Sequence, residues 1–430
     1  MSIRRYNCDM RQPKIFTTLR TYSWTLFVAD LLAGVTVAMV ALPLSLAIAI
    51  ASGADPAKGI TTAIIGGFLI SLFGGSRVQI GGPTGAFIVV VFGVIAHHGY
   101  DGLVLATFMA GIILLVGGYF RAGNLIAFVP EAVVSGFTIG IGIIIAISQL
   151  KDFLGLRIDA VPAGFVEKIT ALWEVRDTAG FAPFAIALIT IFLIVLLRRI
   201  APRFPVLIIG LGVSSALVAF MSLPVDTLGS RFGDLSSQMP WPELPNLSFA
   251  RIVELLPSAF TIAFLAGVES LLSAMVADKM IEGHHRPNAE LTAQGIANIG
   301  SALFAGLPAT GAIARTATNI KAGGKTPVAG IVHAIVILLM MLLFAPLVSD
   351  LAMPALAALL VVTAWNMTEP HKWIQYARGR KSDIFLLLLT LVLTVLVDLT
   401  VAIGVGVSIG LALRLNRRKS TESDWSPRDR

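Results

Sequence analysis

Long runs of apolar residues recur along this chain from Leu31 to Leu415, interrupted only by glycine, proline and short charged clusters. Hydrophobic residues make up 56% of the 430 and charged residues 13%, where a soluble domain carries about a quarter of its residues charged. A chain this apolar cannot bury its surface in one aqueous core, so lipid must be its main solvent. The sequence therefore predicts an all-α, polytopic membrane protein.

We divide the apolar runs into about fourteen predicted spans. They cover residues 30–53, 58–74, 84–97, 102–120, 130–149, 181–198, 203–222, 257–277, 290–305, 311–321, 327–347, 351–366, 382–397 and 399–414. The third and tenth are too short to cross a bilayer core of about 30 Å as helices. Because non-helical backbone at that depth is tolerated only when it is buried in protein or lines a cavity, these two spans are candidates for the functional site.

The charged residues predict how the chain is oriented. An even number of spans puts both termini on one side. If that side is the cytoplasm, 24 of the 32 Lys and Arg residues lie inside, 7 lie outside, and Arg315 lies within the membrane. Cytoplasmic loops carry this excess of positive charge, which accounts for the net charge of +7 without a nucleic-acid partner. With no recognisable signal peptide, we expect a multi-pass protein of a bacterial-type inner membrane with both termini cytoplasmic.

A faint internal repeat links the two short spans. The segment 82–87, Gly-Pro-Thr-Gly-Ala-Phe, opens the third span, and the segment 307–313, Leu-Pro-Ala-Thr-Gly-Ala-Ile, opens the tenth. Seven spans separate them, so the two halves enter the membrane with opposite polarity, as in transporters whose interrupted helices form a central site. The predicted organisation follows: a cytoplasmic segment 1–29, a first inverted repeat 30–222, an extracytoplasmic loop 223–256, a second repeat 257–414 and a cytoplasmic tail 415–430.

Two half-helices that begin inside the membrane would direct their free N–H groups toward each other. Each helix N-terminus is equivalent to roughly half a positive charge, so together they would form a cradle for an anion. Thr84 and Thr310 could add hydroxyl donors. In the alternative interpretation, the small residues of these segments only let helices pack closely.

Arg315 is the most informative single residue of the sequence, because it lies early in the tenth span with no loop nearby. A charge near the centre of a bilayer costs several kcal/mol and indicates a functional site by default. We expect a fixed positive charge that helps to hold a substrate anion. The alternatives are an arginine that reaches the membrane interface or one that closes a structural salt bridge.

Glu269 lies inside the eighth span, and Ser273 follows four residues later on the same helical face. This pair suits a site for Na⁺ built of hard oxygens, or a carboxyl group that carries H⁺. Glu269 could also pair with Arg315 as a buried ion pair. No other metal site, cofactor or nucleophile–base constellation is recognisable, so an enzyme is not expected.

Taken together, these segments resemble the sulfate permease (SulP, solute carrier 26-like) family of inorganic anion transporters. The first three spans carry the resemblance in Asp30-Leu-Leu-Ala-Gly34, Ala41-Leu-Pro43, Phe73-Gly-Gly-Ser76 and Gly82-Pro-Thr84. The eighth to tenth spans carry it in Glu269-Ser-Leu-Leu-Ser273, Val276-Ala-Asp278, Gly311-Ala-Ile-Ala-Arg315-Thr316 and Gly323-Gly-Lys-Thr326. The resemblance covers nearly the whole chain.

The resemblance implies a seven-plus-seven inverted repeat in which a core domain moves against a gate domain, and it implies a homodimer. It also implies that the anion lies between the third and tenth spans and that the acid of the eighth span, here Glu269, with Ser273, serves coupling to Na⁺ or H⁺. The implied substrate-binding residues are Pro83, Thr84, Gly85, Ala86, Phe87, Thr310, Gly311, Ala312, Ile313 and Arg315.

Three features depart from the family pattern. Leu44 stands where many members have glutamine, and Ala314 stands where a small hydroxyl residue often precedes the arginine. Both changes remove polar contacts from the expected site. About sixteen residues follow Arg414, too few for the cytoplasmic STAS domain that most members carry.

The sequence thus predicts a secondary active transporter of small anions, either sulfate, bicarbonate or a dicarboxylate, driven by Na⁺ or H⁺ through elevator-type alternating access. Its partners would be the anion, the coupling ion, membrane lipid and a second copy of the chain. The alternatives are a nucleobase–cation symporter of the same fold, which would have an acid near the position of Arg315, and an anion channel without coupling.

Overall fold

The structure is a computed structural model that describes residues 12–126, 130–158, 161–162, 164–201, 204–233, 238–397 and 399–416. Its α-helices are α2 Lys14–Thr18, α3 Trp24–Ala51, α4 Pro56–Phe73, α5 Ile88–Tyr119, α6 Gly123–Ile126, α7 Glu131–Ser148, α8 Leu150–Leu154, α9 Phe165–Glu174, α10 Phe181–Ile200, α11 Val206–Phe220, α12 Leu228–Phe232, α13 Phe249–Ile281, α14 Pro287–Leu303, α15 Ile313–Lys321, α16 Val328–Ser349, α17 Met353–Met367, α18 Trp373–Ala377, α19 Lys381–Leu396 and α20 Leu399–Asn416. Short 3₁₀ turns are η1 Leu19–Thr21, η2 Gly85–Phe87, η3 Arg176–Thr178 and η4 Pro370–Lys372. The two strands are β1 Gly81–Gly82 and β2 Thr310–Gly311.

Helices lie along the predicted apolar runs, as expected of a polytopic membrane protein, while the division into fourteen spans stays a prediction. In the described part of the chain, six helices are long and apolar enough to cross a membrane: Trp24–Ala51, Pro56–Phe73, Gly85–Tyr119, Glu131–Leu154, Phe181–Ile200 and Phe249–Ile281. Others, such as α11 and α17, are apolar but shorter. Large apolar side chains on the outside of the bundle, among them Phe181 and Phe192 of α10, are exposed and available to lipid.

Several boundaries differ from the prediction; α13, for example, begins at Phe249 rather than at residue 257. The first long helix, α3, begins at Trp24 rather than at residue 30, because Ser23 caps it by accepting a hydrogen bond from the Leu26 N–H at 3.3 Å. The third and fourth predicted spans form one helical stretch, α5, with a break at Gly99, where φ is +71°. A glycine adopts this conformation without strain, so one residue makes the turn where the sequence predicts a short loop.

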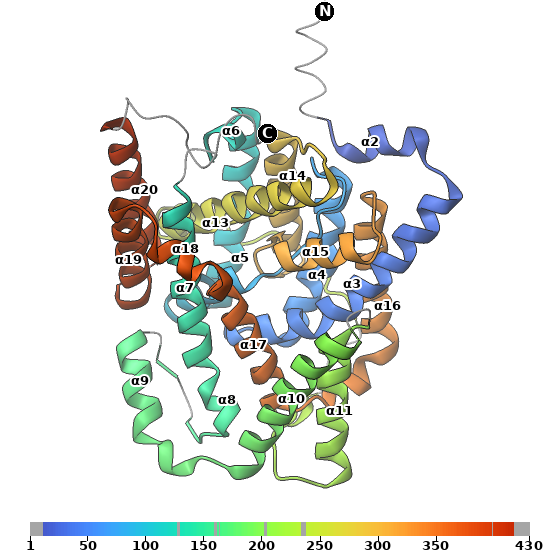
Figure 1. The fold of residues 1–430 in the computed structure, drawn as a ribbon, viewed down its shortest axis with the longest axis vertical. Coiled ribbons are helices and arrows are strands. Elements are labelled where there is room, and N and C mark those ends of the chain that lie inside the picture. The colour runs from blue at the N-terminus through green and yellow to red at the C-terminus, as the bar shows by residue number, and fades with distance from the viewer. Residues whose placement is uncertain are drawn as a thin grey trace, which may run out of the picture.

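The long helices form two packed groups, visible in Figure 1. The first consists of α3, α4, α5 and α13 to α16, and the second of α7, α10, α11, α17, α19 and α20. The first group combines α3 to α5 with α13 to α16, which follow them by more than a hundred residues. Fewer contacts join the two groups. The main ones are those of α17 and α11 with α3, and those of α7 with α5.

Loops that the charge count places on one side of the membrane lie together at one end of the molecule. At one end, Arg286 donates a hydrogen bond to the Gln12 carbonyl, and the Lys14 N–H donates to the Gly74 carbonyl, beside α2. The opposite end joins the predicted outer loops: Arg231 pairs with Asp152 at 2.6 Å, His98 with Glu254 at 3.0 Å, and Thr227 bridges to Ala352. Figure 1 has α2 near one end of the molecule and α9 near the other.

Candidate functional site

The two predicted anion-binding segments meet in the middle of the first helix group. Strands β1 and β2 pair antiparallel, with Gly81 opposite Gly311 and Gly82 opposite Thr310, and all four residues are buried. The Ala312 N–H extends the pairing by donating to the Ile80 carbonyl at 2.9 Å. Each strand is followed at once by a helical segment, η2 and α5 after β1 and α15 after β2. The unsatisfied N–H groups of two helix N-termini therefore lie at one crossing point.

Glycine at β1 and β2 makes this close pairing possible. A methyl group on Gly81 would lie 2.2 Å from Ile70 Cδ1, and one on Gly311 would lie 1.6 Å from Gln79 Nε2. Asn298 of α14 then fixes the approach to β2, because its amide donates to the Ala309 carbonyl at 2.8 Å and accepts from the Ala309 N–H at 3.0 Å. The sequence pattern of Gly, Pro and Thr thus encodes a tight backbone crossing.

Arg315 lies at the centre of this crossing and is only 1% exposed. Its Nη2 donates to Ser45 Oγ of α3 at 3.1 Å and to the Pro83 carbonyl at 3.0 Å. Its buried Nε and Nη1 have no hydrogen-bond partner among the described residues. Buried donors of a charged group are normally satisfied, so the guanidinium is both fixed in place and left with binding capacity.

Gly82 determines where this guanidinium can lie. Its φ is +150°, and a methyl group added there would lie 2.2 Å from Arg315 Nη1. We expect Gly82→Ala to displace the arginine head and lower anion flux by about tenfold or more, while the protein still purifies as a folded species. Gly212→Ala on α11 is the matched control, because a methyl group there meets nothing within 4 Å. Equal flux in the two variants would contradict the role of Gly82.

Glu269 of α13 faces the same crossing. Its Oε2 accepts a hydrogen bond from Thr84 Oγ1 at 2.8 Å, which joins the eighth-span acid to the start of η2. Within the described residues no ion pair joins Glu269 to Arg315. Ser273 is also buried, but its hydroxyl donates to Thr316 Oγ1 at 3.3 Å rather than contacting Glu269. Glu269 and Thr84 therefore form the polar pair of the site.

The other predicted site residues differ in their contacts and in their exposure. The Thr310 hydroxyl donates to the Ala266 carbonyl of α13 at 2.8 Å and so is engaged within the protein. Pro83, Ala86, Phe87, Gly311 and Ala312 are buried. Ile313 is 39% exposed.

Gly85 places the site against the second helix group. A methyl group on Gly85 would lie 3.1 Å from Met367 Sδ of α17 and 3.6 Å from Ile145 Cδ1 of α7. The start of η2 therefore lies at the boundary between the two groups of helices. This is the position a ligand must have if motion between the groups is to expose it to each side in turn.

A buried carboxylate that is not among the predicted site residues anchors the loop ahead of β1. Glu290 of α14 is fully buried and accepts hydrogen bonds from the N–H groups of Gly75 and Ser76 at 2.8 and 3.1 Å. Ser270 and Gln294 side chains donate to its other oxygen at 3.0 and 2.8 Å. Gln79 Nε2 in turn donates to Ser270 Oγ at 2.8 Å. The sequence signal that could have indicated this buried network is Glu290 with Gln294 four residues later in an apolar stretch.

The described residues contain no group of three or more His, Cys, Asp or Glu side chains that could hold a metal ion. At the crossing, Glu269 supplies a carboxylate and Thr84 a hydroxyl, and the two share a hydrogen bond.

Comparisons with known proteins agree with this architecture. The model described as the sulfate permease family matches residues 27–390. The putative sulfate transporter YvdB of Bacillus subtilis is 43% identical over 372 residues, which cover 86% of this chain and 70% of that protein. The bicarbonate transporter BicA of Picosynechococcus is 32% identical over 346 residues, which cover 77% of this chain. The match spans 60% of BicA, less than two thirds of its length.

Two solved structures have the same arrangement of helices. The transmembrane domain of a cyanobacterial bicarbonate transporter BicA superposes with a TM-score of 0.78 at 29% identity, over 91% of this chain and 98% of that domain. The structure of SLC26A9 superposes with a TM-score of 0.86 over 98% of this chain and 70% of that one. At 18% identity the second likeness concerns the fold alone.

Proposed function

The chain belongs to the sulfate permease family, an anion transporter family, and from that premise we propose that it is a secondary active transporter of small oxyanions. The proposed substrates are sulfate, bicarbonate or a dicarboxylate. Two relatives carry sulfate or bicarbonate transport in their names, which favours the first two.

One observation carries the proposal. The Arg315 guanidinium is held between two helix N-termini, with Nε and Nη1 left without a partner among the described residues. Helix N-termini and a fixed guanidinium both favour negative charge. An uncharged nucleobase would gain little from this arrangement, so the nucleobase–cation symporter is not supported by a specific observation.

We propose that transport follows a seven-plus-seven inverted repeat in which the first helix group is the core and the second the gate. The antiparallel crossing of β1 and β2, each followed by a helical segment, supports the repeat. The position of Gly85 against Met367 and Ile145 supports alternating access at the boundary of the groups. The homodimer expected from the sequence stays a prediction.

We propose that Glu269 carries the coupling ion, Na⁺ or H⁺, as a co-substrate. Its carboxylate lies at the crossing, bonded to Thr84 of the anion-binding segment, so occupation of one site changes the electrostatics of the other. Glu269→Gln should keep the hydrogen bond with Thr84 but lose the dependence of uptake on the cation gradient, with a loss of concentrative uptake of about tenfold or more.

The control for Glu269→Gln is counterflow, in which labelled anion exchanges for unlabelled anion without a driving gradient. Counterflow should persist in the variant. A variant that still concentrates anion in response to Na⁺ or to a pH gradient would exclude Glu269 as the coupling residue.

The proposed function is tested by a flux screen with purified protein in liposomes. Uptake of sulfate, bicarbonate and succinate is measured with and without a Na⁺ gradient and with and without a pH gradient. We expect saturable uptake of at least one anion that responds to one of the gradients. Uptake of uracil but of no anion, or single-channel currents without saturation, would overturn the proposal.

A further inference from the structure

A second charged feature lies away from the crossing, in a cavity of about 1120 Å³ near the α9 end of the molecule. Its walls are formed by the end of α3, the first half of α5, the end of α7, helix α9 and the end of α19. It therefore lies between the two helix groups. Ile88 and Val89, which follow the anion-binding segment directly, form part of the wall, so the cavity extends from the α9 end toward the crossing.

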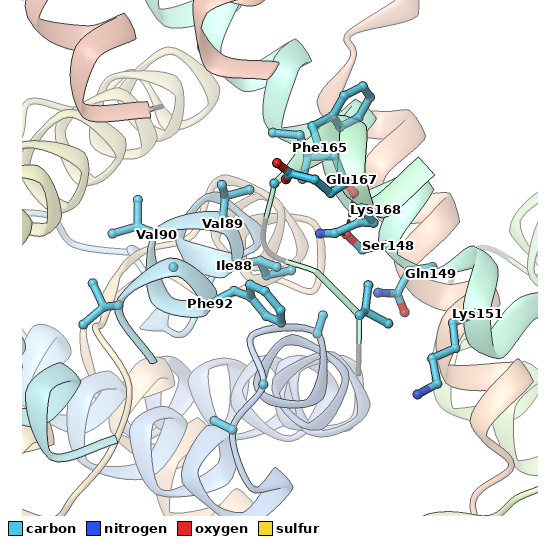
Figure 2. A pocket seen from close by; sticks show the side chains of 18 of the residues that line it. Ile88, Val89, Val90, Phe92, Ser148, Gln149, Lys151, Phe165, Glu167 and Lys168 are labelled. Atoms are coloured by element: carbon cyan, nitrogen blue, oxygen red, sulfur yellow. Dashed lines mark hydrogen bonds between the residues drawn. The ribbon is translucent and has the colours of Figure 1, made fainter. Parts of the chain in front are cut away.

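Lys168 of α9 is buried in the wall of this cavity and is only 4% exposed. Its Nζ donates to Ser148 Oγ at 2.9 Å and lies 5.1 Å from the centre of the Phe92 ring. Figure 2 shows Lys168 beside Ser148, with Phe92 across the cavity and Gln149 farther along the wall. Desolvation by burial lowers the pKa of Lys168, since it disfavours the charged form.

The buried ammonium group has no matching carboxylate. Of the other charged residues that line the cavity, Arg231 and Asp152 pair with each other at 2.6 Å, and Lys151 donates to the Ile158 carbonyl at 2.7 Å. Glu167, the neighbour of Lys168 in α9, is exposed. Within the described residues Lys168 forms no ion pair. A buried cation without a counter-charge is costly unless an anion compensates it.

We propose that Lys168, with the Gln149 amide, forms a second anion site that receives a small oxyanion at the mouth of the cavity before it reaches Arg315. The Ser148 hydroxyl donates to the Ile144 carbonyl at 2.8 Å and holds Lys168 by accepting its hydrogen bond. This inference rests on the proposed function for the direction of traffic, but not for the binding itself. An anion at Lys168 restores the charge balance of the cavity wall. A cationic group in a narrow cavity also raises the local concentration of the anion that the central site must capture.

The binding is tested without transport, by the rate at which a cysteine in the cavity reacts. Cys8 is the only cysteine of the chain, so Cys8→Ser gives a clean background in which Val89→Cys reports from the wall. In detergent, an anionic methanethiosulfonate reagent should react about tenfold faster when Lys168 is present than in Lys168→Met, while a cationic reagent should gain no such advantage. Added sulfate or bicarbonate should slow the reaction only when Lys168 is present.

Further variants separate this site from the central one and from lipid. Lys168→Arg keeps the charge and should keep the advantage of the anionic reagent, and Arg315→Ala should keep it even if transport is lost. The reaction is then repeated in nanodiscs of phosphatidylcholine, with and without an anionic lipid, to distinguish a free anion from a lipid phosphate. If sulfate stops protecting the cysteine only when anionic lipid is present, the site binds the lipid headgroup, and the proposal is overturned.

Flux provides the second readout. Lys168→Met should raise the KM for the anion applied at the α9 end by about threefold to tenfold and leave kcat within about twofold, because the central site is intact. Reagent rates that are equal with and without the Lys168→Met substitution, in proteins that both elute as folded species on size exclusion, would exclude the second site. A loss of flux in every protein with the rate difference preserved would instead contradict only the proposed function.

Discussion

Arg315→Ala should lower kcat/KM for the transported anion by about a hundredfold or more, and no other single substitution in this protein should have a larger effect on flux. Hydrogen bonds to a charged group contribute roughly 1.5–3 kcal/mol each, and the partnerless Nε and Nη1 offer two such bonds to an anion. Each loss of about 1.4 kcal/mol is tenfold in kcat/KM. Initial rates of labelled anion uptake into liposomes measure the effect.

Two further variants show whether the charge or its geometry matters. Arg315→Lys keeps the charge but lacks the planar guanidinium, which donates to Ser45 and Pro83 and still has further N–H groups for an anion. The lysine variant should therefore recover only a small part of the flux. Arg176→Ala removes an exposed arginine and should leave flux unchanged. Normal flux in folded Arg315→Ala protein would refute the anion-holding role of Arg315.

Glu290→Ala should have the largest effect on stability. The substitution leaves four donors without an acceptor, the N–H groups of Gly75 and Ser76 and the side chains of Ser270 and Gln294. An unsatisfied buried donor costs about 1–3 kcal/mol, so the free energy of unfolding should fall by about 4 kcal/mol or more. Thermal unfolding in detergent should show a Tm lower by about 5 °C or more.

The control for this prediction is a carboxylate that is largely exposed to solvent. Glu254, whose side chain is 57% exposed beside His98, should be replaceable by alanine with little change in Tm. Glu290→Gln keeps one acceptor oxygen and should fall between wild type and alanine. A Tm for Glu290→Ala equal to that of Glu254→Ala would contradict the anchoring role of Glu290.

Local pattern in the sequence was enough to find the apolar helical regions and to pair the two segments that cross. Apolar runs located the spans because lipid imposes length and composition on each helix separately. The segments 82–87 and 307–313 could be paired because Gly, Pro and Thr mark a backbone that leaves the helix in two matching places. The sequence related Glu269 to Ser273 and to Arg315, and its hydrogen bond with Thr84 was not foreseen.

Contacts between segments that are distant along the chain could not be predicted from the sequence. Ser45 is 270 positions from Arg315, and no periodicity relates the two. The four donors of Glu290 come from three separate segments, so only the packed fold shows that this acid is structural rather than a coupling group. From the sequence, the hydroxyls of Ser273 and Thr310 were expected to bind ligands. In the fold, the Ser273 hydroxyl donates to Thr316 and the Thr310 hydroxyl donates to the Ala266 carbonyl.

The position of the bound anion shows whether Arg315 and the two helix starts hold the substrate. An experimental structure with the anion identified by the flux screen, or with selenate as a strongly scattering substitute for sulfate, would locate it. We expect one strong peak between the starts of η2 and α15, within hydrogen-bonding distance of Arg315 Nε or Nη1, and no such peak in Arg315→Ala. A transported anion bound elsewhere, with the space between η2 and α15 empty in wild-type protein, would contradict this expectation.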